Sequence, residues 1–102
     1  MIDLNEAAEN SYKSALQRQH NGADVKVAEI LKHCAGEVIE AQEAFIMWKY
    51  EAHEESKYAE ELADVIICAL IAAKRDGIDI ERAVSLKMQI NAQRAAMQGD
   101  KL

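Results

Sequence analysis

The stretch ELADVIICALIAAKRDG, residues 61–77, decides the fold. It is apolar without interruption from Val65 to Ala73, and its flanks are helix-forming residues that end at Gly77, a helix-stop residue. A short apolar run also suits a strand, but these flanks favour a helix. Because a helix that is apolar on all sides is buried on most of them, we predict a helix at the centre of a bundle.

The rest of the chain also favours helices. It has 102 residues, no proline and four glycines, and half of its residues are apolar. At this length we expect one domain, residues 1–102, because a second core would bury too little surface. Asn21-Gly22 is predicted to end the first helix, and Asp24 and Asp79 are predicted to cap the second and fourth. We predict an all-α, four-helix, bundle-like fold with helices from about Asp3 to His20, Asp24 to Tyr50, Lys57 to Asp76 and Asp79 to Met97.

Charge and patterning exclude several classes of partner. The net charge of −6 argues against binding to the phosphate backbone of DNA or RNA. The first residues lack a signal-peptide pattern, and the apolar run is shorter than the roughly 20 residues that cross a bilayer. We therefore expect a cytoplasmic protein with no nucleic-acid or membrane partner. Cys34 and Cys68 lack CxxC spacing and are expected to be buried, reduced thiols.

Two pairs of carboxylates carry the chemistry. Glu37 and Glu40 are three residues apart and share one side of the second helix, at the border of its apolar stripe. Glu61 and Asp64 repeat this spacing at the start of the apolar helix. An antiparallel return of the chain would bring the pairs together, and hard divalent cations would relieve their repulsion. All-oxygen ligation favours Mg²⁺ or Mn²⁺ over zinc, although each pair alone is also typical of a solvated helix face.

An ordered set of four elements resembles the all-α NTP pyrophosphatases of the MazG type. The elements are Glu37-x-x-Glu40, Glu61-Leu-Ala-Asp64-Val-Ile-Ile, Gly77-Ile-Asp-Ile and Lys87-x-x-x-Asn91-x-x-Arg94. The resemblance covers about residues 28–95. It implies a helical fold, hydrolysis of a nucleoside triphosphate to the monophosphate and pyrophosphate, and a role in nucleotide-pool clean-up. It also implies Mg²⁺ on the four carboxylates, with Mn²⁺ as a substitute, and a homodimer or homotetramer.

The remaining site residues are assigned by their chemistry. Glu40 is our candidate for the carboxylate that activates water, with the other three carboxylates as alternatives. Lys87, Asn91 and Arg94 share one stripe of the fourth helix and would suit the outer phosphates, although a solvated polar face has the same pattern. Trp48 lies about 16 Å along the helix from Glu37 and could stack on the base, or could serve packing.

Two other readings of the sequence stay open. One is a sister activity with the same metal chemistry, such as a phosphoribosyl-ATP pyrophosphohydrolase or a dimeric dUTPase. The other is a helical assembly module that binds no metal and turns over no substrate. The apolar helix also predicts a homo-oligomer in both cases, because a chain this short cannot surround it fully.

Overall fold

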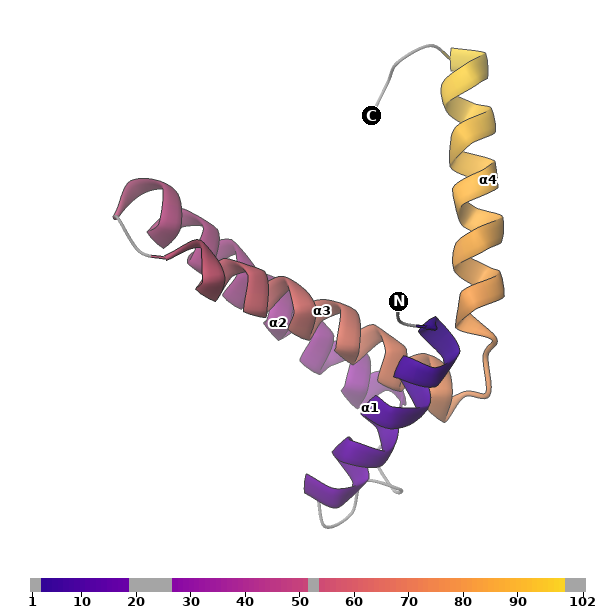
Figure 1. Cartoon of the computed structure of the whole chain (residues 1–102), viewed down its shortest axis with the longest axis horizontal. Helices are drawn as coiled ribbons and strands as arrows, with labels where there is room; N and C mark the ends of the chain where they lie inside the picture. Colours follow the sequence, from indigo (N-terminus) through magenta and orange to yellow (C-terminus); the bar gives the residue numbers. More distant parts are fainter. Residues whose placement is uncertain (1–2, 19–26, 52–53, 99–102) are drawn as a thin grey trace.

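The protein is built from helices throughout the part that the structure describes. The computed structural model describes residues 3–18, 27–51 and 54–98. It contains α1 (Leu4–Arg18), α2 (Val27–Tyr50), α3 (Glu55–Arg75) and α4 (Ile80–Gln98), as Figure 1 shows. The predicted all-α class and its four helices are confirmed. No helix among these residues is long and apolar enough to cross a membrane.

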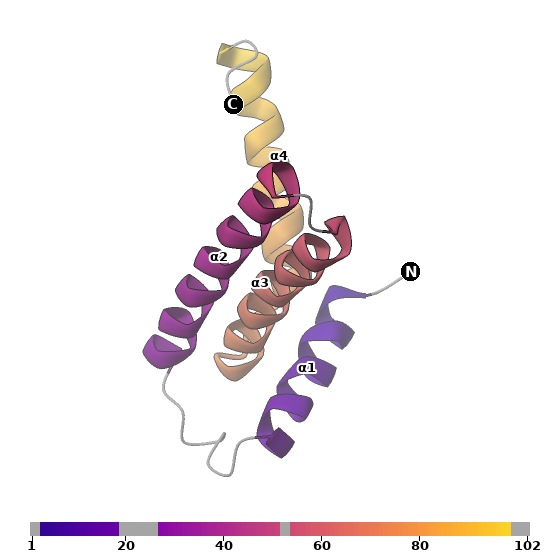
Figure 2. The same cartoon turned by 90° about the vertical axis from the view of Figure 1, so that its left-hand side faces the viewer.

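Three of the helices form one layer with α3 in the middle. α1 packs against one side of α3 and α2 packs antiparallel against the other, as Figure 2 shows. The residues of α2 that this packing buries are small, Ala41 and Ala44, so the two backbones approach closely. Cys68, Leu70, Ala72 and Ala73 are the buried apolar residues of α3.

α4 leaves this layer through a sharp corner. Gly77 adopts a φ of 69°, a left-handed conformation that favours glycine and ends α3 as predicted. Asp79 then caps α4 as predicted, because its Oδ1 accepts a hydrogen bond of 3.1 Å from the backbone N–H of Arg82. From there α4 projects away from the other helices (Figure 1), so the packed bundle within one chain has three helices.

Asn5 on α1 holds the start of α4. Its Nδ2 donates to Asp79 Oδ1 at 2.9 Å, and its Oδ1 accepts from the backbone N–H of Glu81 at 3.3 Å. In return Glu81 Oε1 accepts from the backbone N–H of Leu4 at 3.3 Å. The hydrogen bond from Asn5, followed by the backbone N–H of Arg82, lowers the pKa of Asp79. The N-termini of α1 and α4 are thus fixed to one another.

Most predicted helix boundaries differ slightly from the observed ones. α3 begins at Glu55 rather than Lys57, and the acidic Glu55 in its first turn favours the helix dipole. α2 ends at Tyr50 as predicted. The predicted end of the first helix at His20, its Asn21-Gly22 stop and the Asp24 cap lie outside the described residues.

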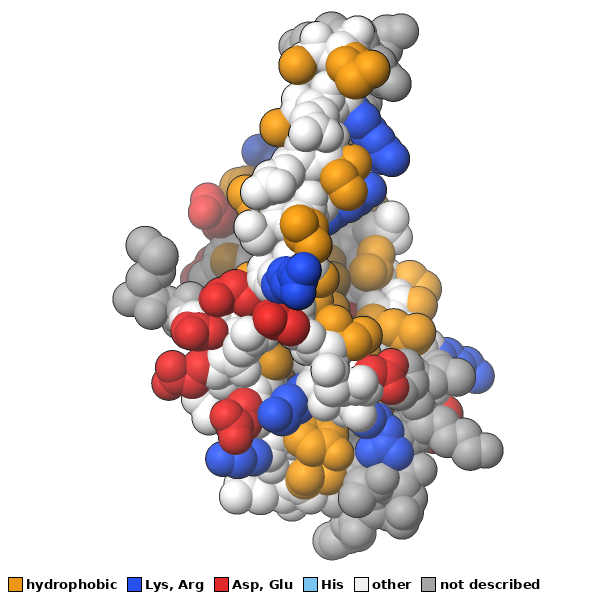
Figure 3. All heavy atoms as spheres, turned by 90° about the vertical axis from the view of Figure 1, so that its right-hand side faces the viewer, with side chains coloured by type: hydrophobic (Ala, Val, Ile, Leu, Met, Phe, Trp, Pro, Cys, Tyr) orange, Lys and Arg blue, Asp and Glu red, His pale blue; other side chains and the backbone are white. Residues whose placement is uncertain are grey.

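The single chain leaves much apolar surface exposed. It exposes 7996 Å², whereas a folded monomer of this mass exposes about 5800 Å². Its radius of gyration is 16.1 Å, compared with about 13 Å for a compact domain of this length. Within the helix predicted to be buried on most sides, Ile66 keeps 57% of its surface exposed and Ile67 38%. Figure 3 shows apolar and basic side chains along the exposed length of α4.

Candidate metal centre

The antiparallel packing of α2 on α3 brings three of the four predicted metal ligands together. Glu37, Glu61 and Asp64 each offer an oxygen, and these oxygens all lie within 4.8 Å of one another. Glu61 is only 6% exposed and is the one buried polar or charged residue in the part of the chain that the structure describes. Glu37 is partly buried and Asp64 is exposed, so the cluster runs from the helix contact towards the surface.

Each of the two less exposed carboxylates has one partnered oxygen and one orphaned oxygen. Lys57 Nζ lies 3.0 Å from Glu61 Oε1, and His33 Nε2 lies 3.2 Å from Glu37 Oε1. Glu61 Oε2 and Glu37 Oε2 are buried and have no hydrogen-bond partner among the described residues. Such atoms are costly unless something binds them, and hard divalent cations prefer carboxylate oxygens. The donor set therefore fits Mg²⁺ or Mn²⁺.

Glu40, the fourth predicted ligand, lies at the rim of this cluster rather than inside it. The negative charge of Glu37 is the main cause that raises the pKa of Glu40, followed by desolvation and by the charges of Glu61 and Asp64. The proximity of the Glu61 carboxylate, through its charge and its capacity to accept a proton, thus contributes to the raised pKa of Glu40. The same Glu61 raises the pKa of Lys57, first through their hydrogen bond and then through its charge.

Two cavities adjoin the carboxylates on different sides. One, of about 430 Å³, is lined by Glu40, Lys57 and Glu61 among others. The other, of about 470 Å³, has Glu37 and Asp64 in its wall and receives three polar side chains from α1, namely Asn10, Ser11 and Ser14. The sequence analysis did not identify these α1 residues. Their spacing along α1 was the available signal, because residues 10, 11 and 14 share one side of a helix.

A comparison with models of protein families shows to which family the chain is related. Residues 22–102 match the model of the MazG-like family. The chain belongs to the MazG-like family. The resemblance seen in the sequence is therefore confirmed, and membership supports a hydrolase-type enzyme of the nucleotide pyrophosphohydrolase kind. A search of curated proteins found no match, and a search of solved structures found none either.

The predicted phosphate-binding residues of this MazG-like chain do not join the carboxylates in one subunit. Lys87, Asn91 and Arg94 are exposed on α4, whose contacts with the rest of the described chain are to α1 and α3. α4 projects away from the α2–α3 pair that carries the carboxylates (Figure 1). Their assignment to the phosphates stays a prediction.

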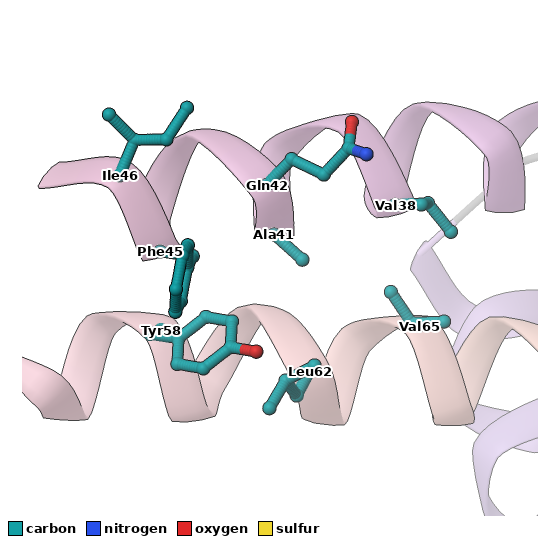
Figure 4. Close-up of a pocket in the computed structure, with 8 residues that line it drawn as sticks. All are labelled: Val38, Ala41, Gln42, Phe45, Ile46, Tyr58, Leu62 and Val65. Atoms are coloured by element: carbon teal, nitrogen blue, oxygen red, sulfur yellow. The ribbon is translucent and has the colours of Figure 1, made fainter. Parts of the chain in front are cut away.

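Trp48 is part of an aromatic cluster at the far end of the α2–α3 pair. Its ring stacks on Tyr58 with a centroid distance of 5.6 Å and meets the edge of Phe45 at 6.2 Å. Lys49 Nζ lies 4.1 Å from the centre of the Trp48 ring. Phe45 and Tyr58 also line an apolar cavity of about 700 Å³, and Gln42 on α2 is the polar residue of its lining besides Tyr58 (Figure 4). Trp48 thus contributes to packing, and its binding of a base stays a prediction.

Proposed function

We propose that the chain is a Mg²⁺-dependent nucleoside triphosphate pyrophosphohydrolase that converts an NTP or dNTP and water to the monophosphate and pyrophosphate. The observation that carries this proposal is the pair of orphaned, buried oxygens of Glu37 and Glu61 beside Asp64. An all-oxygen cluster of this kind binds phosphate-bridging cations, and membership of the MazG-like family supports the same chemistry. A cytoplasmic role in nucleotide-pool clean-up agrees with it.

The roles of the residues follow from their positions. Glu37, Glu61 and Asp64 would hold the ion, with Glu40 at their edge. Mg²⁺ bound there would neutralise phosphate charge and lower the pKa of a water molecule. The Glu40 carboxylate would orient this water and accept its proton, since Glu40 lines the cavity beside Glu61. We expect attack at the α-phosphorus, with pyrophosphate as the leaving group.

The phosphate end of the site would come from a second copy of the chain. The excess exposed area of about 2200 Å² over a compact monomer exceeds the roughly 800 Å² per partner that a stable interface buries. α4 carries Leu86 and Ile90 exposed beside the polar stripe of Lys87, Asn91 and Arg94. In a homodimer or homotetramer, α4 of one copy would present these cations and the amide to the phosphates bound by its partner.

A pyrophosphate-release screen across NTPs and dNTPs with Mg²⁺ tests this function. We expect turnover in the wild type and a loss of at least about 10²-fold in Glu61→Gln and Asp64→Asn, because a neutral amide is a poor ligand for a hard cation. Calorimetric titration should show weaker Mg²⁺ binding in the same variants. Glu60→Gln is the matched control, since Glu60 is the exposed neighbour of Glu61 on α3, and it should retain activity. Full activity in Glu61→Gln and Asp64→Asn would contradict the mechanism and favour a non-catalytic helical module.

A further inference from the structure

The two cysteines lie against one another across the α2–α3 contact. Cys68 Sγ on α3 donates a hydrogen bond of 3.6 Å to the backbone carbonyl of Ile30 on α2. Ile30 is one helical turn before Cys34, so this bond seats Cys68 on the same turn of α2. Burial, followed by the neighbouring Cys34, raises the pKa of Cys68, which places the two thiols in each other's surroundings. Both cysteines are free in the structure.

We propose that Cys34 and Cys68 form a reversible intramolecular disulfide between α2 and α3 when a peroxide reaches Cys34. A disulfide needs two Cα atoms about 4.4–6.8 Å apart, so it can form only where two helices approach closely. α2 packs on α3 through Ala41 and Ala44, two and three turns further along from Cys34. Cys68 Sγ already contacts the turn of α2 that runs from Ile30 to Cys34, so the crosslink would join side chains of facing helix turns.

The two thiols differ in their exposure to solvent, and this difference gives them different roles in the proposed oxidation. Cys34 is partly exposed, whereas Cys68 is buried. The burial of Cys68 shields its thiol from dissolved oxidants. Cys34 is therefore the residue that a dissolved oxidant meets first, and Cys68 is the resolving residue beside it.

The reaction balances with the peroxide as oxidant. The Cys34 thiolate attacks one peroxide oxygen, the O–O bond breaks, and a sulfenic acid and one water form. The sulfur of Cys68 then attacks the sulfur of Cys34, its proton leaves with the hydroxyl as a second water, and the S–S bond forms. Two thiols are oxidised and one hydrogen peroxide is reduced to two waters. Two equivalents of a small thiol reverse the change.

The bond would join the helices beside the metal centre. Cys34 is one turn before Glu37, and Cys68 is one turn after Asp64. When no cation is bound, Glu37, Glu61 and Asp64 repel one another across this same helix contact. A disulfide would hold α2 and α3 together against that repulsion, so oxidation should stabilise the fold.

Intact-mass measurement of the full chain tests the proposal. Reduced protein is treated with hydrogen peroxide, digested without reductant and analysed for a crosslinked peptide pair. We expect a chain lighter by two hydrogen atoms, loss of both thiols to a thiol reagent in denaturant, and recovery of both with dithiothreitol. Because the closed loop restricts the unfolded chain, the oxidised protein should melt roughly 10 °C higher or more.

Single variants assign the roles of the two thiols. Cys34→Ser should give neither the crosslink nor the gain in melting temperature, and its buried Cys68 should resist peroxide. Cys68→Ser should leave Cys34 as a sulfenic acid that dimedone captures. Wild-type chains that keep both thiols, gain only oxygen, or crosslink between chains on a non-reducing gel would each overturn the proposal. The measurement on the wild-type chain tests the disulfide by itself, so the proposal remains testable even if a variant fails to fold.

Discussion

α3 and α4 are of nearly equal length, 21 and 19 residues, but their surroundings differ completely. α3 lies between α1 and α2 and supplies most of the buried residues of the described chain. α4 is held only near its start, and its described side chains from Glu81 to Met97 are exposed. The carboxylates on α3 are thus positioned by the chain itself, whereas Lys87 and Arg94 on α4 form no ion pair with any residue that the structure describes.

This difference indicates how the site is divided. An isolated helix of this length is marginal in water, so α4 requires packing that a single subunit does not supply. It carries Val84, Leu86, Met88, Ile90 and Met97 as exposed apolar residues, which suit a protein contact. In the proposed site, the metal half would therefore form within one chain and the phosphate half would depend on assembly.

Mixing two inactive variants is the strongest way to test this division. Lys87→Ala combined with Arg94→Ala should lower kcat/KM by about 10²-fold or more, because two charge-assisted hydrogen bonds to phosphate are lost. When this double variant is co-expressed with Glu61→Gln chains, about a quarter of wild-type activity should return. Half of the dimers are mixed, and in each mixed dimer one of the two sites combines an intact metal half with an intact phosphate half. Pyrophosphate release measures both effects.

The matched control for this experiment mixes Glu61→Gln with Asp64→Asn. Both changes damage the metal half, so no mixed dimer contains an intact site and no activity should return. If the α4 variant and Glu61→Gln form mixed oligomers but recover no activity, the two halves of the site do not come from different chains.

Removing the cation tests how far α3 depends on it. The carboxylates around Glu61 repel one another without a metal, so chelation should lower the melting temperature and Mg²⁺ should restore it. At about 100 times the dissociation constant, the ion should add about 2.7 kcal/mol to the free energy of unfolding. Differential scanning calorimetry measures this. The stabilisation by Mg²⁺ should vanish in Glu61→Gln and persist in the double variant of Lys87 and Arg94. Equal stabilisation of both variants would contradict the division of the site between the two helices.

The raised pKa of Glu40 predicts the pH dependence of the metal centre. The pKa of Glu40 is higher in the folded, metal-free protein than in the unfolded chain. Glu40 therefore stabilises the metal-free protein at pH values below the ordinary pKa of a glutamate, and this stabilisation is lost as the pH rises through the raised pKa. Mg²⁺ binding must displace the proton that Glu40 carries at low pH. The affinity for Mg²⁺ should therefore increase with pH, over a pH range above the one in which an ordinary glutamate titrates. Calorimetric titrations from about pH 5 to about pH 8 measure this. Glu40→Gln should reduce the dependence of Mg²⁺ affinity on pH. An unchanged dependence would show that Glu40 does not take part in metal binding.

The smallest expected effect is at Trp48, where α2 meets the start of α3. Trp48→Ala removes a stacked contact with Tyr58 and should lower the free energy of unfolding by about 1 kcal/mol, as measured by urea denaturation. If the ring also stacks on the substrate base, KM should rise and discrimination between bases should weaken. An unchanged KM in the folded variant removes Trp48 from the site.

The sequence predicted the local features of the molecule best. Gly77 and Asp79 act through their own backbone and nearest turn, so their roles as helix stop and cap followed from residue type. The convergence of Glu37, Glu61 and Asp64 was also predicted, since a short connection between two helices forces an antiparallel return.

Features set by the angles between helices were not predictable from spacing. The departure of α4 depends on the hydrogen bonds of Asn5 to Asp79 and Glu81, which join residues more than seventy positions apart. The proximity of Ser11 to Glu37, and of Tyr58 to Trp48, likewise depends on how whole helices cross. One sequence gives the faces of each helix, but long-range packing decides which faces meet.

The small residues of α2 also have a consequence for ion selectivity. Ala41 and Ala44 are the buried residues in the described part of α2, and their small side chains allow α2 to lie close to α3. Mg²⁺ binds oxygen at about 2.0–2.1 Å and Ca²⁺ at about 2.3–2.6 Å, so in the proposed site the helix spacing would favour the smaller ion. A bulkier side chain at position 41 would widen this spacing. Competition calorimetry on Ala41→Val should show a shift in preference from Mg²⁺ towards Ca²⁺, and an unchanged preference would show that the carboxylate side chains, not the helix backbones, set the radius.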